Sequence, residues 1–369
     1  MGRGASYLIT GGAGFIGRHV AAELLRSGAR VRVLDSLIEQ VHGTDPELPG
    51  ELSGADFVRA DIRDIDAVKE ALESVDGVFH LAAEVGVGQS MYEIDRYTSV
   101  NELGTAVLFQ ALTERPVKRV VTASSMSVYG EGLYQDASGN PVGDAVRGEG
   151  RDWDPVDAQG RPLTPVPTPE TKAPDLASVY ALNKYAQERM THIVAKAYGM
   201  ESVALRMFNV YGPGQALSNP YTGVLAIFAS RLHNGQRPMV FEDGEQRRDF
   251  VHVEDIARAF RLAMETEGVS GRTINAGSGR SVSIAEVARE IAVAMGRPDL
   301  GPDIAGKARK GDVRHCFADI SLARELLGFE PQRSFEDSLG ELAEWVAQQE
   351  CEDKVDEAAS ELQARGLVA

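Results

Sequence analysis

Cysteine is scarce in this chain: Cys316 and Cys351 are its two cysteines among 369 residues. They have no metal-ligand spacing and no His cluster near them, so no metal site is expected. Both are expected to be ordinary thiols of a reducing compartment, which indicates a cytoplasmic protein. The sequence also lacks an Asn-x-Ser/Thr sequon, and this absence agrees with that location.

Long apolar runs are missing as well. No run approaches the ~18 residues that a membrane-spanning helix needs, and the first residues do not resemble a secretory signal. Positive charge is in deficit, with a formal net charge of −17. A charge of that sign repels polyanions, so neither nucleic acid nor a membrane is an expected partner. A small phosphorylated ligand would need a local group of arginines.

Short apolar segments alternate with amphipathic segments along the first half of the chain. This rhythm predicts strands at 7–9, 31–34, 57–58, 77–81, 119–122 and 203–206, and helices at 15–26, 67–72, 98–112 and 178–198. Strands that alternate with helices are typical of a parallel sheet with right-handed crossovers. The expected fold is therefore α/β, with a Rossmann-type doubly wound parallel sheet.

A glycine-rich turn separates the first predicted strand from the first predicted helix. It contains Gly11, Gly14 and Gly17 in one spacing, and an overlapping Gly12-x-Gly14-x-x-Gly17 pattern. Glycines there allow a sharp turn and a close approach of the backbone to a phosphate. The helix that opens with Phe15 and Ile16 offers free N–H groups to a pyrophosphate. The turn thus predicts a dinucleotide site.

Asp35 decides between the two nicotinamide dinucleotides. It ends the second predicted strand, about 18 residues past the last glycine. A carboxylate at this place accepts hydrogen bonds from the adenosine ribose and repels a 2′-phosphate, so NAD is the expected cofactor. Asp61 and Ile62, after the third strand, are weaker candidates for the adenine edge.

The rest of the chain is less regular. A segment rich in Gly, Pro and Asp at 131–175 predicts a long functional loop, and no internal repeat is apparent. The expected domains are an NAD-binding domain at 1–208 with about 249–276, a smaller α+β substrate domain at 209–248 plus 277–350, and a tail helix at 351–369. The acidic helices at 335–363 are expected to present a solvated face.

A candidate catalytic pair lies in the helix at 178–198. Tyr180 and Lys184 are four residues apart and so share one helix face. A nearby ammonium and the positive nicotinamide favour the phenolate and lower the pKa of the tyrosine. Ser124 and Ser125 follow the fifth strand, where a hydroxyl could hydrogen-bond the same substrate oxygen. Such a group beside a hydride acceptor suits oxidation of an alcohol to a ketone.

Taken together, these motifs resemble the extended short-chain dehydrogenase/reductase family, in particular its nucleotide-sugar epimerases and dehydratases. The matching segments are the glycine turn, His80-Leu-Ala-Ala83, Asn101 in Asn-Glu-Leu-Gly-Thr, Ser125 four before Tyr129, Tyr180/Lys184, Arg206-Met-Phe-Asn209-Val-Tyr-Gly-Pro213, Arg248-Asp-Phe-Val-His-Val-Glu-Asp-Ile256, and Gly311-Asp-Val-Arg314 ahead of Asp319.

The resemblance implies roles for individual residues. It implies a catalytic triad of Ser125, Tyr180 and Lys184. Cofactor contacts are implied for Gly11, Gly14, Phe15, Ile16, Gly17, Asp35, Asp61, Ile62, Leu81, Ala82, Ala83, Asn101, Tyr180 and Lys184. Substrate contacts are implied for Glu84, Ser125, Met126, Asn209, Arg248 and Arg314, where Asn209 and both arginines meet the phosphates of a nucleotide sugar.

Three reactions within the family compete. Dehydratases carry an Asp-Glu pair after the catalytic hydroxyl, whereas Met126 and Ser127 stand there, so dehydration is disfavoured. Epimerisation at C4 through a transient 4-keto sugar needs no further acid. Reduction of a 4-keto sugar would use the same residues with a reduced cofactor and remains the alternative. A regulator that only senses NAD would not need both Tyr180 and Lys184.

The substrate and the oligomer follow from the resemblance less directly. The loop and the segment at 219–228 look most like dTDP-L-rhamnose 4-epimerase-type members, although the loop lacks the cysteine pairs often found there. UDP-glucose/galactose or a uronate sugar is the substitute. The family pattern implies a homodimer formed by the helices near 98–112 and 178–198. Its expected apolar face comprises Val107, Leu108, Ala111, Ala177, Ala181 and Tyr185, which burial against the protein's own sheet would equally explain.

Overall fold

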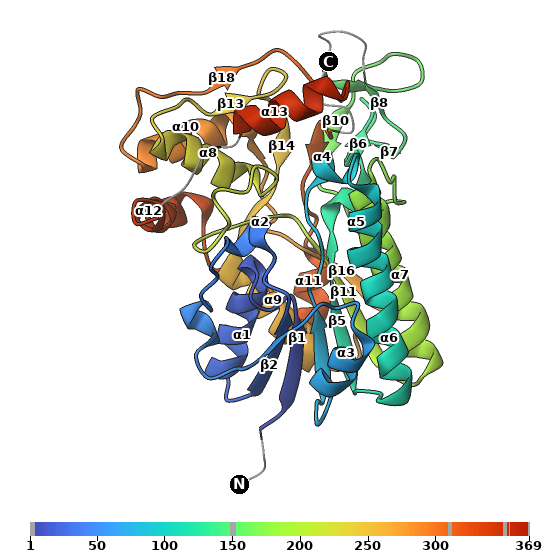
Figure 1. Cartoon of the computed structure of the whole chain (residues 1–369). Helices are drawn as coiled ribbons and strands as arrows, with labels where there is room; N and C mark the ends of the chain where they lie inside the picture. Colours follow the sequence, from blue (N-terminus) through green and yellow to red (C-terminus); the bar gives the residue numbers. More distant parts are fainter. Residues whose placement is uncertain (1–3, 148–152, 309–311, 350–352, 354, 368–369) are drawn as a thin grey trace.

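A central sheet of seven parallel strands organises the molecule. The computed structural model describes residues 4–147, 153–308, 312–349, 353 and 355–367. The strand order is β16-β11-β5-β4-β1-β2-β3 (Figure 1). These strands are β1 (Ser6–Thr10), β2 (Arg30–Asp35), β3 (Asp56–Arg59), β4 (Gly77–His80), β5 (Arg119–Ser125), β11 (Glu201–Met207) and β16 (Arg272–Ala276).

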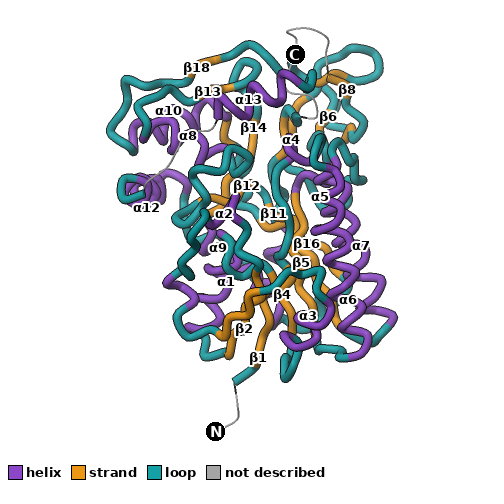
Figure 2. The backbone as a smooth tube through the Cα atoms, in the orientation of Figure 1, coloured by secondary structure: helices purple, strands orange, loops and turns teal. Residues whose placement is uncertain are grey.

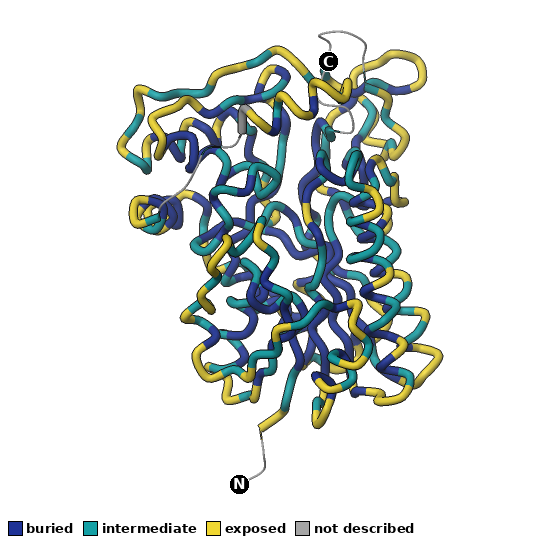
Figure 3. The backbone as a smooth tube through the Cα atoms, in the orientation of Figure 1, coloured by how far each residue is buried: buried dark blue, intermediate teal, exposed yellow. Residues whose placement is uncertain are grey.

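Helices cover both faces of this sheet (Figure 2). One face is covered by α1 (Phe15–Arg26), α9 (Val253–Glu265) and α11 (Ser321–Leu327), and the other by α3 (Ile65–Ala71), α6 (Gly104–Glu114) and α7 (Val179–Ala197). Each face has its own hydrophobic cluster, with Phe79 in one and Val78 in the other. Neighbouring residues of a strand point to opposite faces, so Val78 and Phe79 of β4 are both apolar and both buried. The strands are the most deeply buried part of the molecule (Figure 3).

The predicted doubly wound α/β sheet is confirmed. Each strand predicted in the first 206 residues is present, with its ends shifted by a few residues. The helix predicted at 98–112 differs. It is divided into α5 (Ile94–Thr98), the π-helical turn η2 (Ser99–Leu103) and α6. The π-helical turn contains the buried Asn101, and such wide turns are frequent at functional sites.

A second, smaller assembly lies beyond the carboxyl ends of the strands (Figure 1). Its strands are β12 (Asn209–Tyr211), β13 (Met239–Val240), β14 (Arg247–Arg248), β15 (Phe250–His252), β17 (Val282–Ser283), β18 (Asp303–Ile304) and β19 (His315–Cys316). Helices α8 (Val224–His233), α10 (Ile284–Ala294) and α12 (Phe335–Val346) pack around a hydrophobic cluster of their own, which includes Phe228, Ile291 and Leu342. The predicted domain boundaries stay a prediction.

The segment at 131–175 is more regular than its composition suggests. It forms β6 (Leu133–Gln135), β7 (Pro141–Val142), β8 (Val146–Arg147), β9 (Pro155–Val156) and β10 (Thr164–Val166). A five-residue pattern, Asp-Ala-x-Gly-x, makes two of its turns. Asp136 accepts hydrogen bonds from the backbone N–H groups of Ser138 and Asn140. Asp157 likewise accepts hydrogen bonds from the backbone N–H groups of Gln159 and Arg161. The predicted long loop therefore contains short strands and two Asp-opened turns, and its functional role stays a prediction.

Shorter elements complete the chain. They are α2 (Glu39–His42), η1 (Gly50–Leu52), α4 (Val87–Ser90), η3 (Met126–Tyr129) and α13 (Val355–Ala364). The expected tail helix is α13, which buries Leu362 beside Gly88. Cys316 is a buried free thiol, whereas Cys351 lies outside the described residues. Among the described helices, none combines the length and the apolar character that crossing a membrane requires.

Candidate active site

One large cavity of about 1710 Å³ opens at the carboxyl ends of the central strands. It extends from the glycine turn to the loops of the smaller assembly. Its walls include these residues predicted from the sequence: Gly11, Gly14, Phe15, Ile16, Gly17, Asp35, Asp61, Ile62, Leu81, Ala82, Ala83, Glu84, Ser125, Tyr180, Lys184 and Asn209. Four other predicted residues, Asn101, Met126, Arg248 and Arg314, do not line it.

The glycine turn is shaped by close backbone contacts. Gly11 has a φ of +69°, and a Cβ there would come within 2.7 Å of the Ala82 backbone. A Cβ on Gly17 would collide with the Gly11 carbonyl oxygen. Gly14 caps α1 without any side-chain hydrogen bond, so the first N–H groups of that helix remain available to an anion.

Asp35 ties the glycine turn to the segment after β2. Its Oδ2 accepts the Ala13 N–H at 3.0 Å, and its Oδ1 accepts the Leu37 N–H at 2.9 Å. A carboxylate has about four acceptor positions, so capacity remains for ribose hydroxyls. His42 Nε2 lies 3.9 Å from Oδ1, and burial lowers the pKa of this histidine.

Asp61 and Ile62, the residues predicted for the adenine edge, line the cavity. Their contact with adenine stays a prediction. Arg63 Nη2 donates to Asp61 Oδ2 at 2.6 Å, and this hydrogen bond lowers the pKa of the Asp61 carboxyl. Asp61 therefore presents a charged carboxylate that a neighbouring arginine already occupies in part.

Tyr180, Ser125 and Lys184 converge at the floor of the cavity. Ser178 caps α7 and fixes the start of the helix, and the Tyr180 N–H donates to Ser90 Oγ at 3.1 Å. The Ser125 hydroxyl acts on the Tyr180 phenol by lowering its pKa, and Ser125 Oγ accepts the Ser127 N–H at 3.1 Å. The three predicted catalytic side chains thus share one corner of the cavity.

Burial sets the protonation of this corner. It raises the pKa of Tyr180 to about 12, against the hydrogen bond from Ser125, and lowers the pKa of Lys184 to about 7. The expected lowering of the tyrosine pKa by Lys184 is therefore not seen in the chain by itself, where burial raises this pKa and only Ser125 acts against it. A nearby positive charge would favour the phenolate.

A buried polar network supports Lys184. Its Nζ donates to Gln187 Oε1 at 2.9 Å, and Gln187 Nε2 donates to Thr105 Oγ1 at 2.9 Å. His80 lies between Thr10 and Thr105, at 2.8 Å from each hydroxyl. Burial lowers the pKa of His80 to about 3, so its ring stays neutral. The network holds the lysine without adding a competing negative charge.

Asn101 acts on the cavity wall from behind. Its Oδ1 accepts the Glu84 N–H at 2.7 Å and its Nδ2 donates to the Glu84 carbonyl at 3.1 Å. Glu84 in turn accepts two hydrogen bonds from Arg96, at 3.0 and 2.8 Å. Asn101 therefore positions the segment after β4 that carries Leu81, Ala82 and Ala83, and its predicted contact with the cofactor stays a prediction.

Asn209 is the predicted phosphate contact that does face the cavity. Its backbone is fixed by a hydrogen bond to the Asp249 carbonyl at 2.9 Å, while its Oδ1 has no hydrogen-bond partner among the described residues. A buried polar atom without a partner is unfavourable, so a ligand donor is expected to meet it.

Arg314 and Arg248 are placed differently from the prediction. The Arg314 side chain is 2% exposed and pairs with Glu242, Asp243 and Asp154 at 2.6 to 3.0 Å. Burial alone would lower its pKa, but the hydrogen bonds that Arg314 donates to the carboxylates of Asp243 and Asp154 raise it overall. Arg248 donates to the backbone carbonyls of Arg314 and Val313. Each guanidinium is held by acceptors within the protein, and neither arginine lines the cavity. The predicted contacts of both arginines with the substrate phosphates stay a prediction.

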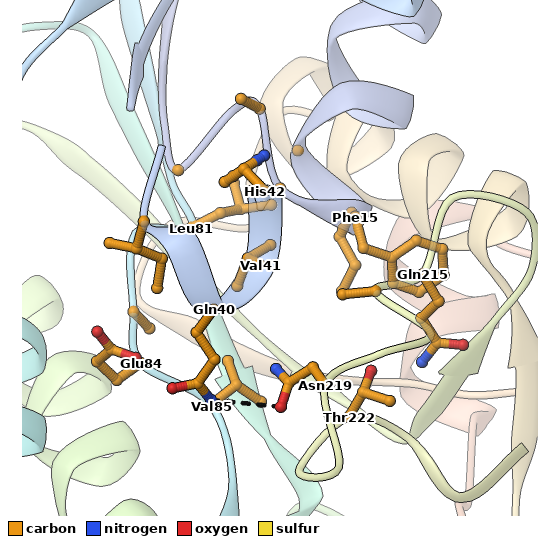
Figure 4. A pocket seen from close by; sticks show the side chains of 18 of the residues that line it. Phe15, Gln40, Val41, His42, Leu81, Glu84, Val85, Gln215, Asn219 and Thr222 are labelled. Carbon is orange, nitrogen blue, oxygen red and sulfur yellow. Dashed lines mark hydrogen bonds between the residues drawn. The ribbon is translucent and has the colours of Figure 1, made fainter. Parts of the chain in front are cut away.

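Several cavity residues have no sequence motif that would identify them. Gln40 comes from the segment after β2, and Gln215, Asn219 and Thr222 come from the loop between β12 and α8 (Figure 4). A Gln or Asn in a loop looks like any solvated residue. The positive φ of Gly214 and its contact with Arg18 bring this loop to the cavity, and neither is legible in sequence.

The residues present fit NAD. The glycine cradle leaves no room for a Cβ at Gly11 or Gly17, as close approach of a pyrophosphate requires. Asp35 retains acceptor capacity, and the buried Arg18 Nε, which also lines the cavity, has no hydrogen-bond partner among the described residues, with the Glu51 carboxylate 3.8 Å away. A group of three or more metal-ligating side chains does not occur among the described residues.

Comparisons with known proteins agree with this geometry. Residues 7–277 match the NAD dependent epimerase/dehydratase family. A dTDP-L-rhamnose 4-epimerase from Burkholderia thailandensis is 38% identical over 356 residues, covering 94% of this chain and 96% of the relative. A putative UDP-glucose 4-epimerase from Methanocaldococcus jannaschii is 31% identical, covering 92% of this chain and 97% of the relative.

Solved structures show the same fold. UDP-glucose 4-epimerase from Thermotoga maritima, crystallised with UDP-glucose, has a TM-score of 0.76 and 32% identity, over 92% of this chain and 98% of that chain. The Thermus thermophilus UDP-glucose 4-epimerase complex with NAD has a TM-score of 0.73 and 29% identity, over 94% and 100%. The resemblance inferred from the motifs is confirmed, and NAD is the cofactor of the group. The chain belongs to the NAD-dependent epimerase/dehydratase family.

Proposed function

We propose that this protein is a nucleotide-sugar 4-epimerase that inverts C4 of a hexose through a transient 4-keto sugar. The observation that carries the proposal is the corner formed by Tyr180, Ser125 and Lys184, which opens into the same cavity as the glycine turn. A reversible proton acceptor beside a hydride acceptor is sufficient for this reaction. Curated relatives at 38% and 31% identity carry 4-epimerase names.

The chain's own residues supply binding, orientation and proton transfer. NAD, which the glycine turn and Asp35 would hold, would supply a reversible hydride acceptor for C4 of the sugar. Tyr180 takes the proton of the C4 hydroxyl and gives it back, while the Ser125 hydroxyl orients the same oxygen. Lys184, once protonated, favours the phenolate by its charge. Asn209 offers its unpartnered Oδ1 to the substrate side.

The absence of an acid pair after Ser125 supports epimerisation over dehydration. Met126 and Ser127 stand in η3, directly after the hydroxyl, and neither transfers a proton at neutral pH. Met126 also lies outside the cavity wall, so its predicted substrate contact is not supported by its position. Tyr180 is therefore the main residue that transfers a proton to and from the sugar.

We take a dTDP-6-deoxyhexose as the first candidate substrate, since the Burkholderia thailandensis relative is named dTDP-L-rhamnose 4-epimerase. UDP-glucose or UDP-galactose is the second, supported by the Thermotoga maritima structure with UDP-glucose. A cytoplasmic location, expected from the cysteines, stays a prediction.

The test is incubation with a panel of dTDP- and UDP-hexoses, including the 6-deoxy and uronate forms, without added cofactor. Inversion at C4, followed by NMR of the sugar, is the expected result. No inversion, but consumption of reduced cofactor once a 4-keto sugar is supplied, would instead make the protein a reductase. NAD, and not NADP, is expected in the supernatant of the denatured protein.

We further propose a homodimer formed through α6 and α7. Leu108, Ala111 and Ala181, which were expected on that face, are buried in the protomer itself, so they cannot provide it. Large apolar side chains that do remain exposed in this region are Leu103, Leu182 and Ile193, at 52%, 49% and 60%. A second copy would cover them. Light scattering should give twice the chain mass, and Leu182→Glu with Leu103→Glu should give a monomer.

A further inference from the structure

Three carboxamide side chains join opposite walls of the cavity. Gln40 lies on α2, Gln89 on α4 and Asn219 on the loop between β12 and α8. Gln40 Nε2 donates to Gln89 Oε1 at 3.0 Å and to Asn219 Oδ1 at 3.3 Å, and Gln89 Nε2 donates back to Gln40 Oε1 at 3.2 Å. Figure 4 shows the bond between Gln40 and Asn219 as a dashed line between the two side chains.

Two members of this cluster are held firmly in place. Gln89 is buried, accepts the Tyr97 hydroxyl at 3.1 Å and donates to Glu93 Oε1 at 3.1 Å. Asn219 is also buried, and its Oδ1 accepts the Tyr221 N–H at 3.0 Å. Gln40 is partly exposed and therefore the movable member. A buried amide group without a hydrogen-bond partner destabilises the protein, so hydrogen bonding of Gln89 and Asn219 with Gln40 is favoured.

The backbone before Gln40 is bent toward the cavity by Asp35. Leu37 has a φ of +53°, which is unfavourable for a residue with a Cβ and persists only where the surroundings enforce it. The enforcing contacts are the hydrogen bond from the Leu37 N–H to Asp35 Oδ1 and the burial of the Leu37 side chain. The carboxylate that faces the ribose thus also directs Gln40 across the opening.

We propose that Gln40, Gln89 and Asn219 form a latch that retains NAD between the two hydride transfers. The inference rests on the proposed epimerase function. After the first transfer the hydride resides on the cofactor and the proton on Tyr180, and both must return to the same sugar. Loss of the reduced cofactor at that moment would release a 4-keto sugar and an inactive protein. The latch joins the segment beyond the cofactor's ribose to a loop of the substrate side.

The test measures retention of NAD by the purified protein. Gln40→Leu keeps the bulk of the side chain and removes its hydrogen bonds, and it should release NAD about tenfold faster in gel filtration and dilution experiments. Asn219→Ser and the variant that carries both substitutions complete a double-mutant cycle. If the two residues act through one bond, the double variant should release NAD no faster than the faster single variant.

The matched control is Gln236→Leu, the same substitution at an exposed glutamine that does not line the cavity, which should release NAD at the wild-type rate. Unchanged release from Gln40→Leu, or effects that multiply in the double variant, would overturn the latch. A second readout is 4-keto sugar that escapes during turnover, which should rise in Gln40→Leu. Failure of the proposed function looks different: the wild type would invert no sugar in the panel while still holding NAD.

Discussion

The cofactor end and the substrate end of the cavity are built in different ways. At the cofactor end, Gly11, Gly17 and Asp35 lie within 25 residues of one another and are joined by backbone contacts. At the substrate end, Ser125, Asn209 and Asn219 come from separate segments that meet only in the folded chain. At the substrate end, the hydrogen-bond partner of a polar side chain depends on which distant segments the fold brings next to it. Local sequence motifs therefore predict the positions of residues well at the cofactor end and less well at the substrate end.

The catalytic corner, where the two ends meet, gives the largest expected effect. Tyr180→Phe removes the proton acceptor and should lower kcat about 10³-fold or more, because general acid–base catalysis contributes at this level. Binding of NAD and of a nucleotide sugar, measured by calorimetry, should stay close to that of the wild type. Tyr185→Phe, on the same helix, serves as the control. A Tyr180→Phe enzyme with normal turnover would remove Tyr180 from its role.

Arg314 tests the substrate end. Arg314→Met removes a positive charge that pairs with the fully buried carboxylate of Glu242. This loss should lower the free energy of unfolding by about 3 kcal/mol, as measured by urea denaturation. Arg280→Met breaks an exposed pair with Glu336 and should cost less than about 1 kcal/mol. If Arg314→Met left stability unchanged and raised only the KM for substrate, the arginine would be a phosphate ligand after all.

Gly17 tests the cofactor end. Gly17→Ala places a Cβ against the Gly11 carbonyl, and the forced backbone shift should cost about 2 kcal/mol and release bound NAD. Gly14→Ala is the comparison in the same turn, because its Cβ would lie 3.4 Å from the nearest atom and its φ is negative. Thermal unfolding with and without added NAD measures both. Equal stability of the two variants would contradict the packing described here.

The smallest effect concerns pH. Since burial lowers the pKa of Lys184 to about 7, the unfolded chain binds this proton above pH 7 while the folded chain does not. Unfolding free energy should therefore rise with pH from about 7 towards the ordinary lysine value, by about 1 kcal/mol per unit near pH 8.5. Lys184→Met should lack this slope. Parallel pH curves for the two proteins would show that Lys184 stays charged.

The comparison also shows how far sequence reasoning extends. Strand–helix alternation and glycine spacing predicted the sheet, its strands and the cofactor turn, because apolar periodicity and backbone conformation are local properties. The same reasoning missed the hairpins at 131–175, although Asp136 and Asp157 open two copies of one turn pattern. It also missed the π-helical turn at Asn101, since that turn depends on a contact with Glu84.

The sequence by itself determined the α/β class, the glycine turn after the first strand, NAD as the cofactor, and the Tyr180–Lys184 pair. Each of these depends on residues close in the chain, whose geometry follows from helix and strand periods. Only the tertiary structure decided that Arg314 is enclosed by carboxylates, that Asn101 supports the wall from behind, and that Gln40 reaches Asn219. A charged or amide side chain takes the best partner within reach, and the fold alone determines which partners are within reach.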